Sequence, residues 1–188
     1  MATIVAPPPR ASLPRDMGRD GGSGPGASIT HRTGVMLGLA AVSMMFIGLT
    51  SAYVVSQGLG PLWKQVHLSP LIGINAAVLL ASGYAMERAR RGISRGWLIG
   101  TLVLGVAFLA GQVGVFRQLA DEGLYLSTGR QTSFYYVLAG LHGIHILGGV
   151  TALAWAAVGM KRSTLELTSL YWHFMGGLWL YLLLVIFL

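Results

Sequence analysis

Five long apolar runs constrain this chain more than any other feature of its sequence. A helix that crosses about 30 Å of hydrocarbon at about 1.5 Å per residue needs about 20 mostly apolar residues. Five segments reach that length: 33–55, 68–86, 97–116, 133–158 and 168–188. Every Asp, Glu, Lys and Arg lies outside them. We therefore predict an all-α membrane protein, a bundle of five transmembrane helices that contain no permanently charged residue.

The composition excludes several other classes of protein. Only 10% of the residues are charged, whereas a soluble domain carries about a quarter, so lipid must be the solvent for most of the chain. The absence of cysteine excludes disulfides, thiolate metal sites and cysteine nucleophiles. The formal charge of +7 lies mostly at the ends of the apolar runs. This placement is typical of a membrane topology signal and not of a nucleic-acid-binding face.

The first 30 residues differ from the rest of the chain. They hold Pro7, Pro8 and Pro9 with many glycines and few large apolar groups, so they cannot bury enough surface to offset the entropy of ordering them. They also lack the apolar core of a signal peptide. We predict a flexible Pro/Gly-rich tail over 1–30 and one transmembrane domain over 31–188.

The basic residues predict the orientation of the chain, because cytoplasmic loops carry an excess of Lys and Arg. Ten of the 13 basic residues fall in the tail and in the second and fourth segments between runs, and three fall on the opposite side. The two groups are Arg10, Arg15, Arg19, Arg32, Arg88, Arg90, Arg91, Arg95, Lys161 and Arg162 against Lys64, Arg117 and Arg130. We expect a cytoplasmic N-terminus and a periplasmic C-terminus.

Glycine is abundant, with 27 residues, and many lie within the apolar runs. Helices in lipid gain little hydrophobic free energy from one another, so close backbone approach at small residues must hold them together. Gly140 and Gly143 in the fourth run are candidates for such contacts. Their face packs within this chain or meets another subunit, and the sequence leaves both alternatives open.

Polar side chains within the runs are further candidate contacts. Asn75, Gln112, His142, His145 and His173 lie in apolar segments, where polar groups are expensive and usually paired. We interpret the three histidines as neutral rings that hydrogen-bond across helices or to a partner subunit.

Metal binding and proton relay are sharper interpretations of these residues. His142 and His145 share one helix face and could form half of a metal site. However, no run supplies a carboxylate, and His173 differs from His145 in depth by about 10 Å. A proton relay usually needs carboxylates, and all six acidic residues lie outside the runs. A stand-alone histidine-metal membrane enzyme is therefore the weaker alternative.

The last two runs carry motifs that resemble a known family. The segment 134–149, FYYVLAGLHGIHILGG, resembles the run FY-LTG-HG-HV--G of cytochrome c oxidase subunit III. The segment 171–180, YWHFMGGLWL, is similar to the family's final-helix run YWHFVD-VWL and places Trp172 and Trp179 among the expected helix or subunit contacts.

Two weaker similarities to the same family lie upstream, at 51–53 (SAY) and over 71–80. The resemblance covers about residues 32–188. It is that of the short, five-helix form of the family, which lacks the first two helices of the full form.

The resemblance implies a subunit without chemistry of its own. It implies no catalytic residue and no metal or cofactor site on this chain, with haem and copper held by partner subunits. The implied role is to pack against the catalytic subunit I, to stabilise it and to support its proton uptake. The implied partners are subunit I, subunit II, subunit IV as a further candidate, and membrane lipids, with a bound phospholipid as a candidate ligand. The implied location is the bacterial inner membrane.

Two positions depart from the family pattern. Val42 and Val115 stand where the family commonly has buried glutamates, so any role that the family assigns to those acids does not carry over to this chain.

The leading hypothesis is a non-catalytic subunit III of a haem–copper oxidase that takes electrons from cytochrome c in aerobic respiration. The alternatives are subunit III of a quinol oxidase and the accessory subunit of a nitric oxide reductase, which the sequence alone separates poorly.

Overall fold

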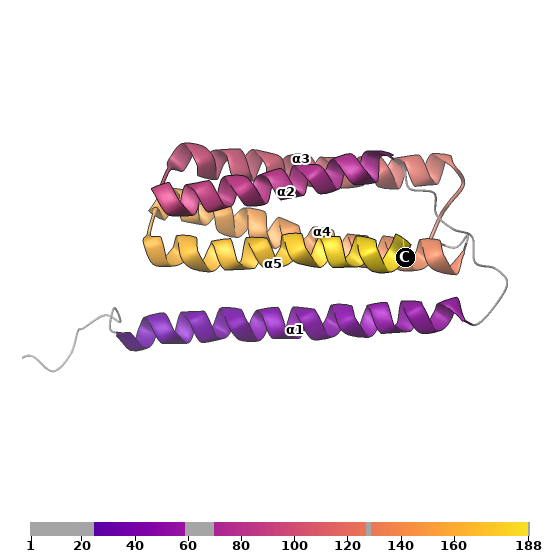
Figure 1. The fold of residues 1–188 in the computed structure, drawn as a ribbon, viewed down its shortest axis with the longest axis horizontal. Coiled ribbons are helices and arrows are strands. Elements are labelled where there is room, and N and C mark those ends of the chain that lie inside the picture. Colours follow the sequence, from indigo (N-terminus) through magenta and orange to yellow (C-terminus); the bar gives the residue numbers. More distant parts are fainter. Residues whose placement is uncertain (1–24, 59–69, 127–128, 188) are drawn as a thin grey trace, which may run out of the picture.

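The computed structural model describes residues 25–58, 70–126 and 129–187. These residues form five α-helices, each of which runs in the opposite direction to the one before it (Figure 1). The helices are α1 (Pro25–Gln57), α2 (Pro70–Gly92), α3 (Arg95–Asp121), α4 (Arg130–Gly159) and α5 (Arg162–Phe187). All five are long and apolar enough to cross a membrane. The predicted all-α fold with five spans is therefore confirmed.

The helices extend beyond the apolar runs, so the prediction that they contain no charged residue is wrong. Helix α2 continues through Glu87, Arg88, Arg90 and Arg91 to Gly92. Helix α3 begins at Arg95 and α5 at Arg162. A helix satisfies its own backbone hydrogen bonds, so nothing forces it to end at the edge of the hydrocarbon. The charged side chains lie on the ends of the helices.

The segments between helices shrink accordingly. Only Ile93 and Ser94 separate α2 from α3, and only Met160 and Lys161 separate α4 from α5. Ile93 and Met160 both have positive φ angles, 46° and 45°, which turn the chain sharply after each helix. Both tight turns lie at the same end of the bundle (Figure 1).

Helix α1 begins at Pro25, inside the range predicted as a tail. Proline is favoured in the first turn of a helix, because its missing N–H would have no partner there. Residues 1–24 lie outside the described residues, as do Lys64 and the rest of 59–69.

Helices α2 to α5 form the core of the bundle. Helix α3 packs between α2 and α4, and α5 closes the group by packing on α4 and α2. Large side chains of these helices are fully buried, including Phe108, Tyr135, Trp172 and Trp179. The largest side chains of the core are therefore aromatic rings from three of the four helices.

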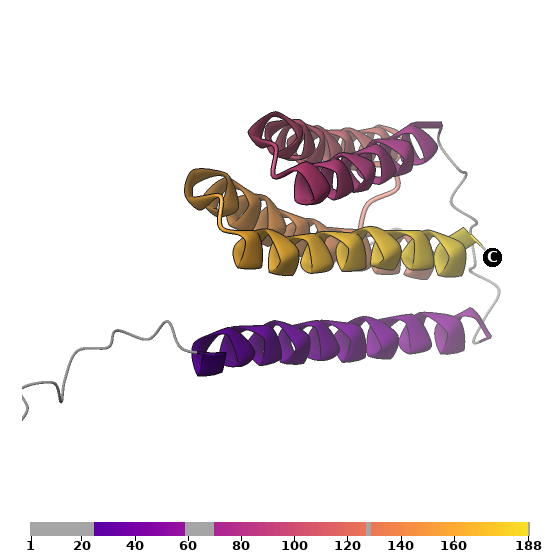
Figure 2. The same cartoon turned by 60° about the vertical axis from the view of Figure 1, so that its left-hand side comes forward.

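Helix α1 lies to one side of this core (Figures 1 and 2). Among the described helices it contacts α5 and α4. A cavity of about 380 Å³ remains between α1 and α5, lined by Phe46, Ile47, Phe174, Leu178 and Tyr181 among others. The attachment of α1 is therefore incomplete along its length.

Candidate functional site

The packing site centres on Trp172 of α5. Its indole lies where Cβ atoms added at Gly105 of α3 and Gly149 of α4 would meet it at 2.7 and 3.0 Å. Glycine at these two positions leaves the space that the ring occupies. The Trp172 indole nitrogen donates to Ser82 Oγ of α2 at 3.1 Å. Trp172 therefore joins four helices at one point.

Ser82 also joins α2 to the backbone of α3. Its hydroxyl donates to the carbonyl of Thr101 on α3 at 3.1 Å, and both Ser82 and Thr101 are fully buried. Ser82 and Thr101 were not among the contact residues predicted from the sequence. Their residue types could have indicated them, because small hydroxyl side chains within spans commonly hydrogen-bond across helices.

Asn75 and Gln112 meet as part of a second polar chain. Asn75 Nδ2 of α2 donates to Gln112 Oε1 of α3 at 3.2 Å, and Gln112 Nε2 donates to the Tyr135 hydroxyl of α4 at 3.2 Å. A Cβ at Gly111 would overlap Asn75 Oδ1, so this glycine admits the amide. The chain links three helices within the apolar core.

His142 lies in the middle of the core and is 0% exposed. Its ring stacks on Trp179 at a centroid distance of 4.9 Å and meets Phe108 edge-on at 5.9 Å. Within the described part of the chain, neither nitrogen of His142 has a hydrogen-bond partner, and neither does the Trp179 indole nitrogen. His142 contributes an aromatic contact to the packing.

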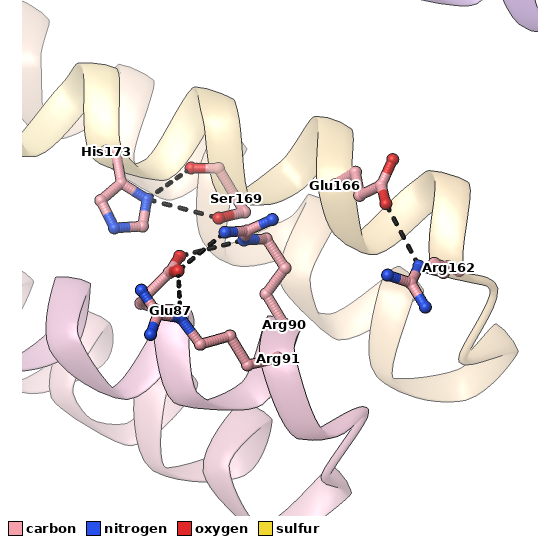
Figure 3. Close-up of polar contacts among 7 residues, drawn as sticks. All are labelled: Glu87, Arg90, Arg91, Arg162, Glu166, Ser169 and His173. Atoms are coloured by element: carbon pink, nitrogen blue, oxygen red, sulfur yellow. Dashed lines mark hydrogen bonds and ion pairs between the residues drawn. The ribbon is translucent and has the colours of Figure 1, made fainter.

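His145 and His173 are satisfied within their own helices. His145 Nδ1 pairs with the carbonyl of Leu141 at 2.7 Å, and His173 Nδ1 with that of Ser169 at 2.8 Å (Figure 3 shows the second). The expected hydrogen bonds from histidine rings across helices are therefore absent among the described residues. Nδ1 of each ring pairs with a backbone carbonyl one turn earlier, and a contact of Nε2 with a partner subunit stays a prediction.

The described residues contain no group of three or more His, Cys, Asp or Glu side chains that could hold a metal ion. Tyr171 of α5 contacts the backbone of α4, where its hydroxyl donates to the His145 carbonyl at 2.8 Å. The polar groups brought together here connect α4 to α5 and do not converge on a common point.

Gly140 and Gly143 lie on an open face. Among the described residues, a Cβ added at either would meet nothing within 4 Å, and Ile144 beside them is exposed. Within the described helices these two glycines therefore contact no other helix, and their contact with another subunit stays a prediction. The helix neighbours of α4 lie on its other side, where Gly149 receives the Tyr171 and Trp172 rings.

Val42 and Val115 are both packed in apolar surroundings. Val115 is buried in the core, and Val42 is partly buried against it. The chain therefore has hydrocarbon at both positions where a buried carboxylate was the family expectation.

Charged groups gather at the end of the bundle that carries the two tight turns. Glu87 accepts hydrogen bonds from Arg90 and Arg91 at 2.7 Å, and Arg162 pairs with Glu166 at 3.3 Å (Figure 3). These ion pairs are exposed or half-exposed, and such pairs add little stability. They lie at the helix ends, outside the apolar runs.

The fold and these contacts define a multi-pass helical membrane protein whose buried polar groups join helices. Comparison with known families then identifies it further. The family model for cytochrome c oxidase subunit III matches residues 18–188. The chain belongs to this family, and its members are subunits of multisubunit haem–copper oxidases.

Individual relatives come from oxidases with two kinds of electron donor. The chain is 30% identical to cytochrome c oxidase subunit 3 of Synechocystis, over 82% of this chain and 74% of the relative. It is 27% identical to a probable cytochrome c oxidase subunit 3 of Nocardia farcinica, over 83% and 92%. It is also 30% identical to the cytochrome bo(3) ubiquinol oxidase subunit 3 of Pseudomonas aeruginosa, over 69% of each chain.

Proposed function

We propose that this chain is a non-catalytic subunit III that packs against the catalytic subunit I of a haem–copper oxidase and stabilises it. The observation that carries the proposal is the use of its buried polar side chains. Asn75 donates to Gln112 and Gln112 to Tyr135, and Trp172 donates to Ser82. Groups committed to joining helices are not free to bind a substrate or to relay protons.

The open face of α4 supports a protein partner for this subunit. Gly140 and Gly143 have no neighbour on this face within the described chain. Small residues on a lipid-facing helix allow the backbone of another helix to approach closely. We place the contact with subunit I here, and subunits II and IV elsewhere on the complex.

Support of proton uptake by the partner is then an indirect effect. With valine at positions 42 and 115, this subunit has no carboxylate there to carry protons. It acts by holding the uptake pathway of subunit I in shape and by binding lipid around it.

The electron donor is cytochrome c in the first candidate and a quinol in the second. Relatives of both kinds match this chain at similar identity, which is the observation that favours keeping the second candidate. The donor binds to partner subunits in either case, so this chain's residues do not select it.

The orientation proposed for the chain is N-terminus in the cytoplasm and C-terminus in the periplasm of a bacterial inner membrane. Arg88, Arg95, Lys161 and other cations at the end with two tight turns support it, and the reported relatives are bacterial. A reporter fused after Phe187 that is active only in the periplasm is the expected result. A reporter active only in the cytoplasm would reverse the orientation.

The proposal is tested by purifying the tagged chain in mild detergent from its native membrane. We expect a haem-containing subunit to co-purify with it, and the haem spectrum to belong to that subunit. Oxygen consumption with reduced cytochrome c against quinol then separates the two candidates. A chain that purifies alone, with stoichiometric metal lost in both His142→Ala and His145→Ala, would defeat the proposal in favour of a metalloenzyme.

A further inference from the structure

A cavity opens at the turn between α4 and α5. It measures about 470 Å³ and is lined by Trp155, Val158, Lys161 and Thr164, together with Ala156 and Gly159. Trp155 and Val158 are 80% and 81% exposed, so the apolar wall faces outward from the bundle. Lys161 also lines this cavity and carries a positive charge. The lining therefore combines apolar side chains with a cation.

A second cation lies beside this cavity. The guanidinium of Arg95, at the start of α3, donates to the carbonyl of Ala157 at 3.1 Å. Ala157 sits between the lining residues Ala156 and Val158. The contact brings the charge of the α2–α3 turn to the end of α4.

The surrounding charges leave this corner positive. Six cations and two acids occupy the two turns and their helix ends: Arg88, Arg90, Arg91, Arg95, Lys161 and Arg162 with Glu87 and Glu166. Both acids are already paired, Glu87 with Arg90 and Arg91 and Glu166 with Arg162 (Figure 3). Lys161 forms no ion pair with the described residues. An anion at Lys161 would therefore meet no repelling neighbour in the cavity lining.

The position of the corner along the bundle matches the level of lipid headgroups. Trp155 and Val158 are the last large side chains of α4 before it ends at Gly159, and tryptophan favours the boundary between hydrocarbon and headgroups. Basic pockets between transmembrane helices at this level attract anionic lipid headgroups.

We propose that this corner is a binding site for one anionic phospholipid. Its phosphate pairs with Lys161 in the field of Arg95, and one acyl chain lies along Trp155 and Val158. The inference deepens the proposed role in lipid binding by naming a place and a lipid class, and it rests on the bundle lying in a membrane. It does not depend on which subunit covers Gly140 and Gly143.

The test uses the intact complex purified in mild detergent and exposed to equal amounts of phosphatidylglycerol and phosphatidylethanolamine. Native mass spectrometry measures the ratio of the two lipids retained. Loss of one interfacial cation is expected to lower that ratio about fivefold in Lys161→Gln, and Lys161→Arg should restore it. Trp155→Ala should weaken retention of both lipids. The matched control is Arg88→Gln, since Arg88 lies over the Tyr84 and Trp97 rings and does not line the cavity.

Three outcomes would overturn the site. An unchanged lipid ratio in Lys161→Gln would show that Lys161 does not bind the phosphate. An equal fall in Arg88→Gln would show that the lipid responds to the overall surface charge and not to this site. A photo-crosslinking amino acid at Val158 should capture lipid, and capture of a neighbouring subunit would mean that protein covers the corner. All of these can occur while the chain still co-purifies with a haem-containing subunit, so failure of the lipid site is distinguishable from failure of the proposed function.

Discussion

Helices α1 and α3 are almost equally apolar, yet α3 is packed into the core whereas α1 lies beside it. Their most apolar stretches have mean hydropathies of 2.0 and 2.1, but the buried share is 11% in α1 and 33% in α3. Hydropathy therefore indicates that each helix can lie in lipid, but it does not indicate how tightly the helix packs. In a lipid solvent an apolar helix loses little by remaining exposed.

The glycines of the two regions explain the difference. Gly105, Gly111 and Gly149 of the core each face a side chain from a neighbouring helix. Among the described residues, a Cβ at Gly38 or Gly48 of α1 would meet nothing within 4 Å. The core therefore differs from α1 in having three glycines that receive large or polar groups, whereas α1 is attached at a few points.

Those points lie toward the C-terminal end of α1. The hydroxyls of Thr50 and Tyr181 lie 2.9 Å apart and share a hydrogen bond, and the Tyr53 hydroxyl donates to the Ile186 carbonyl at 3.0 Å. Arg130 donates to the Ser56 carbonyl at 3.2 Å. Local opening of α1 should therefore be easier than opening of the α2–α5 core.

Removal of the Trp172 ring should have the largest effect on the core. Trp172→Ala leaves a cavity between four helices and loses the bond to Ser82, so we expect a loss of about 3 kcal/mol in the free energy of unfolding. Met44→Ala on the exposed side of α1 is the control and should change little. Denaturant titration of the purified chain in micelles measures both. A loss below about 1 kcal/mol in Trp172→Ala would show that the core is not organised around this residue.

Replacing a glycine by leucine should have the next largest effect, and it should destabilise the core but not α1. Gly105→Leu forces a side chain into the Trp172 ring and should cost about 2 kcal/mol, whereas Gly48→Leu meets no neighbour among the described residues and should be neutral. The same titration compares them. If both variants were equally destabilised, α1 would be as closely packed as the core.

The polar chain of the core should contribute less than its packing. Asn75→Leu and Gln112→Leu should each cost about 1 kcal/mol, and a double-mutant cycle should give a coupling of about 0.6 kcal/mol. Additive effects of the two substitutions would mean that the amides do not interact.

The attachment of α1 should respond to the loss of one hydroxyl. In Tyr181→Phe the bond to Thr50 is lost, so we expect amide exchange in α1 to speed up about threefold, as about 0.6 kcal/mol implies, while exchange in α2–α5 stays unchanged. Tyr84→Phe on α2, which α1 does not contact, serves as the control. Faster exchange throughout the bundle would instead make α1 part of one cooperative unit with the core.

The smallest effect is expected for His142→Phe. His142→Phe keeps an aromatic ring against Trp179 and removes two nitrogens without partners, so stability should stay within about 0.5 kcal/mol of the native chain. His142→Gln loses the stacked ring and should cost about 1 kcal/mol. A large loss in His142→Phe would reveal a bonded partner for the imidazole, such as an internal water.

Much of this architecture was predictable from sequence because lipid imposes a simple length rule. The five spans follow from apolar runs, and Asn75 and Gln112 stood out as polar residues in such runs. The helix ends did not follow, since a helix carries Glu87 or Arg91 beyond the hydrocarbon as readily as an apolar residue. Nor did the sequence indicate that Nδ1 of His145 and of His173 pairs with a carbonyl of its own helix, and contacts of these rings with a partner subunit stay a prediction.

The sequence by itself determined that this chain is a five-helix membrane protein of the subunit III family, because the apolar runs and the motifs at 134–149 and 171–180 are local properties. Only the tertiary structure decided which glycines are occupied. Gly105 and Gly149 receive Trp172, while Gly140 and Gly143 remain open. All four read alike along the chain, and a glycine acquires its role only from the side chain that another helix places opposite it.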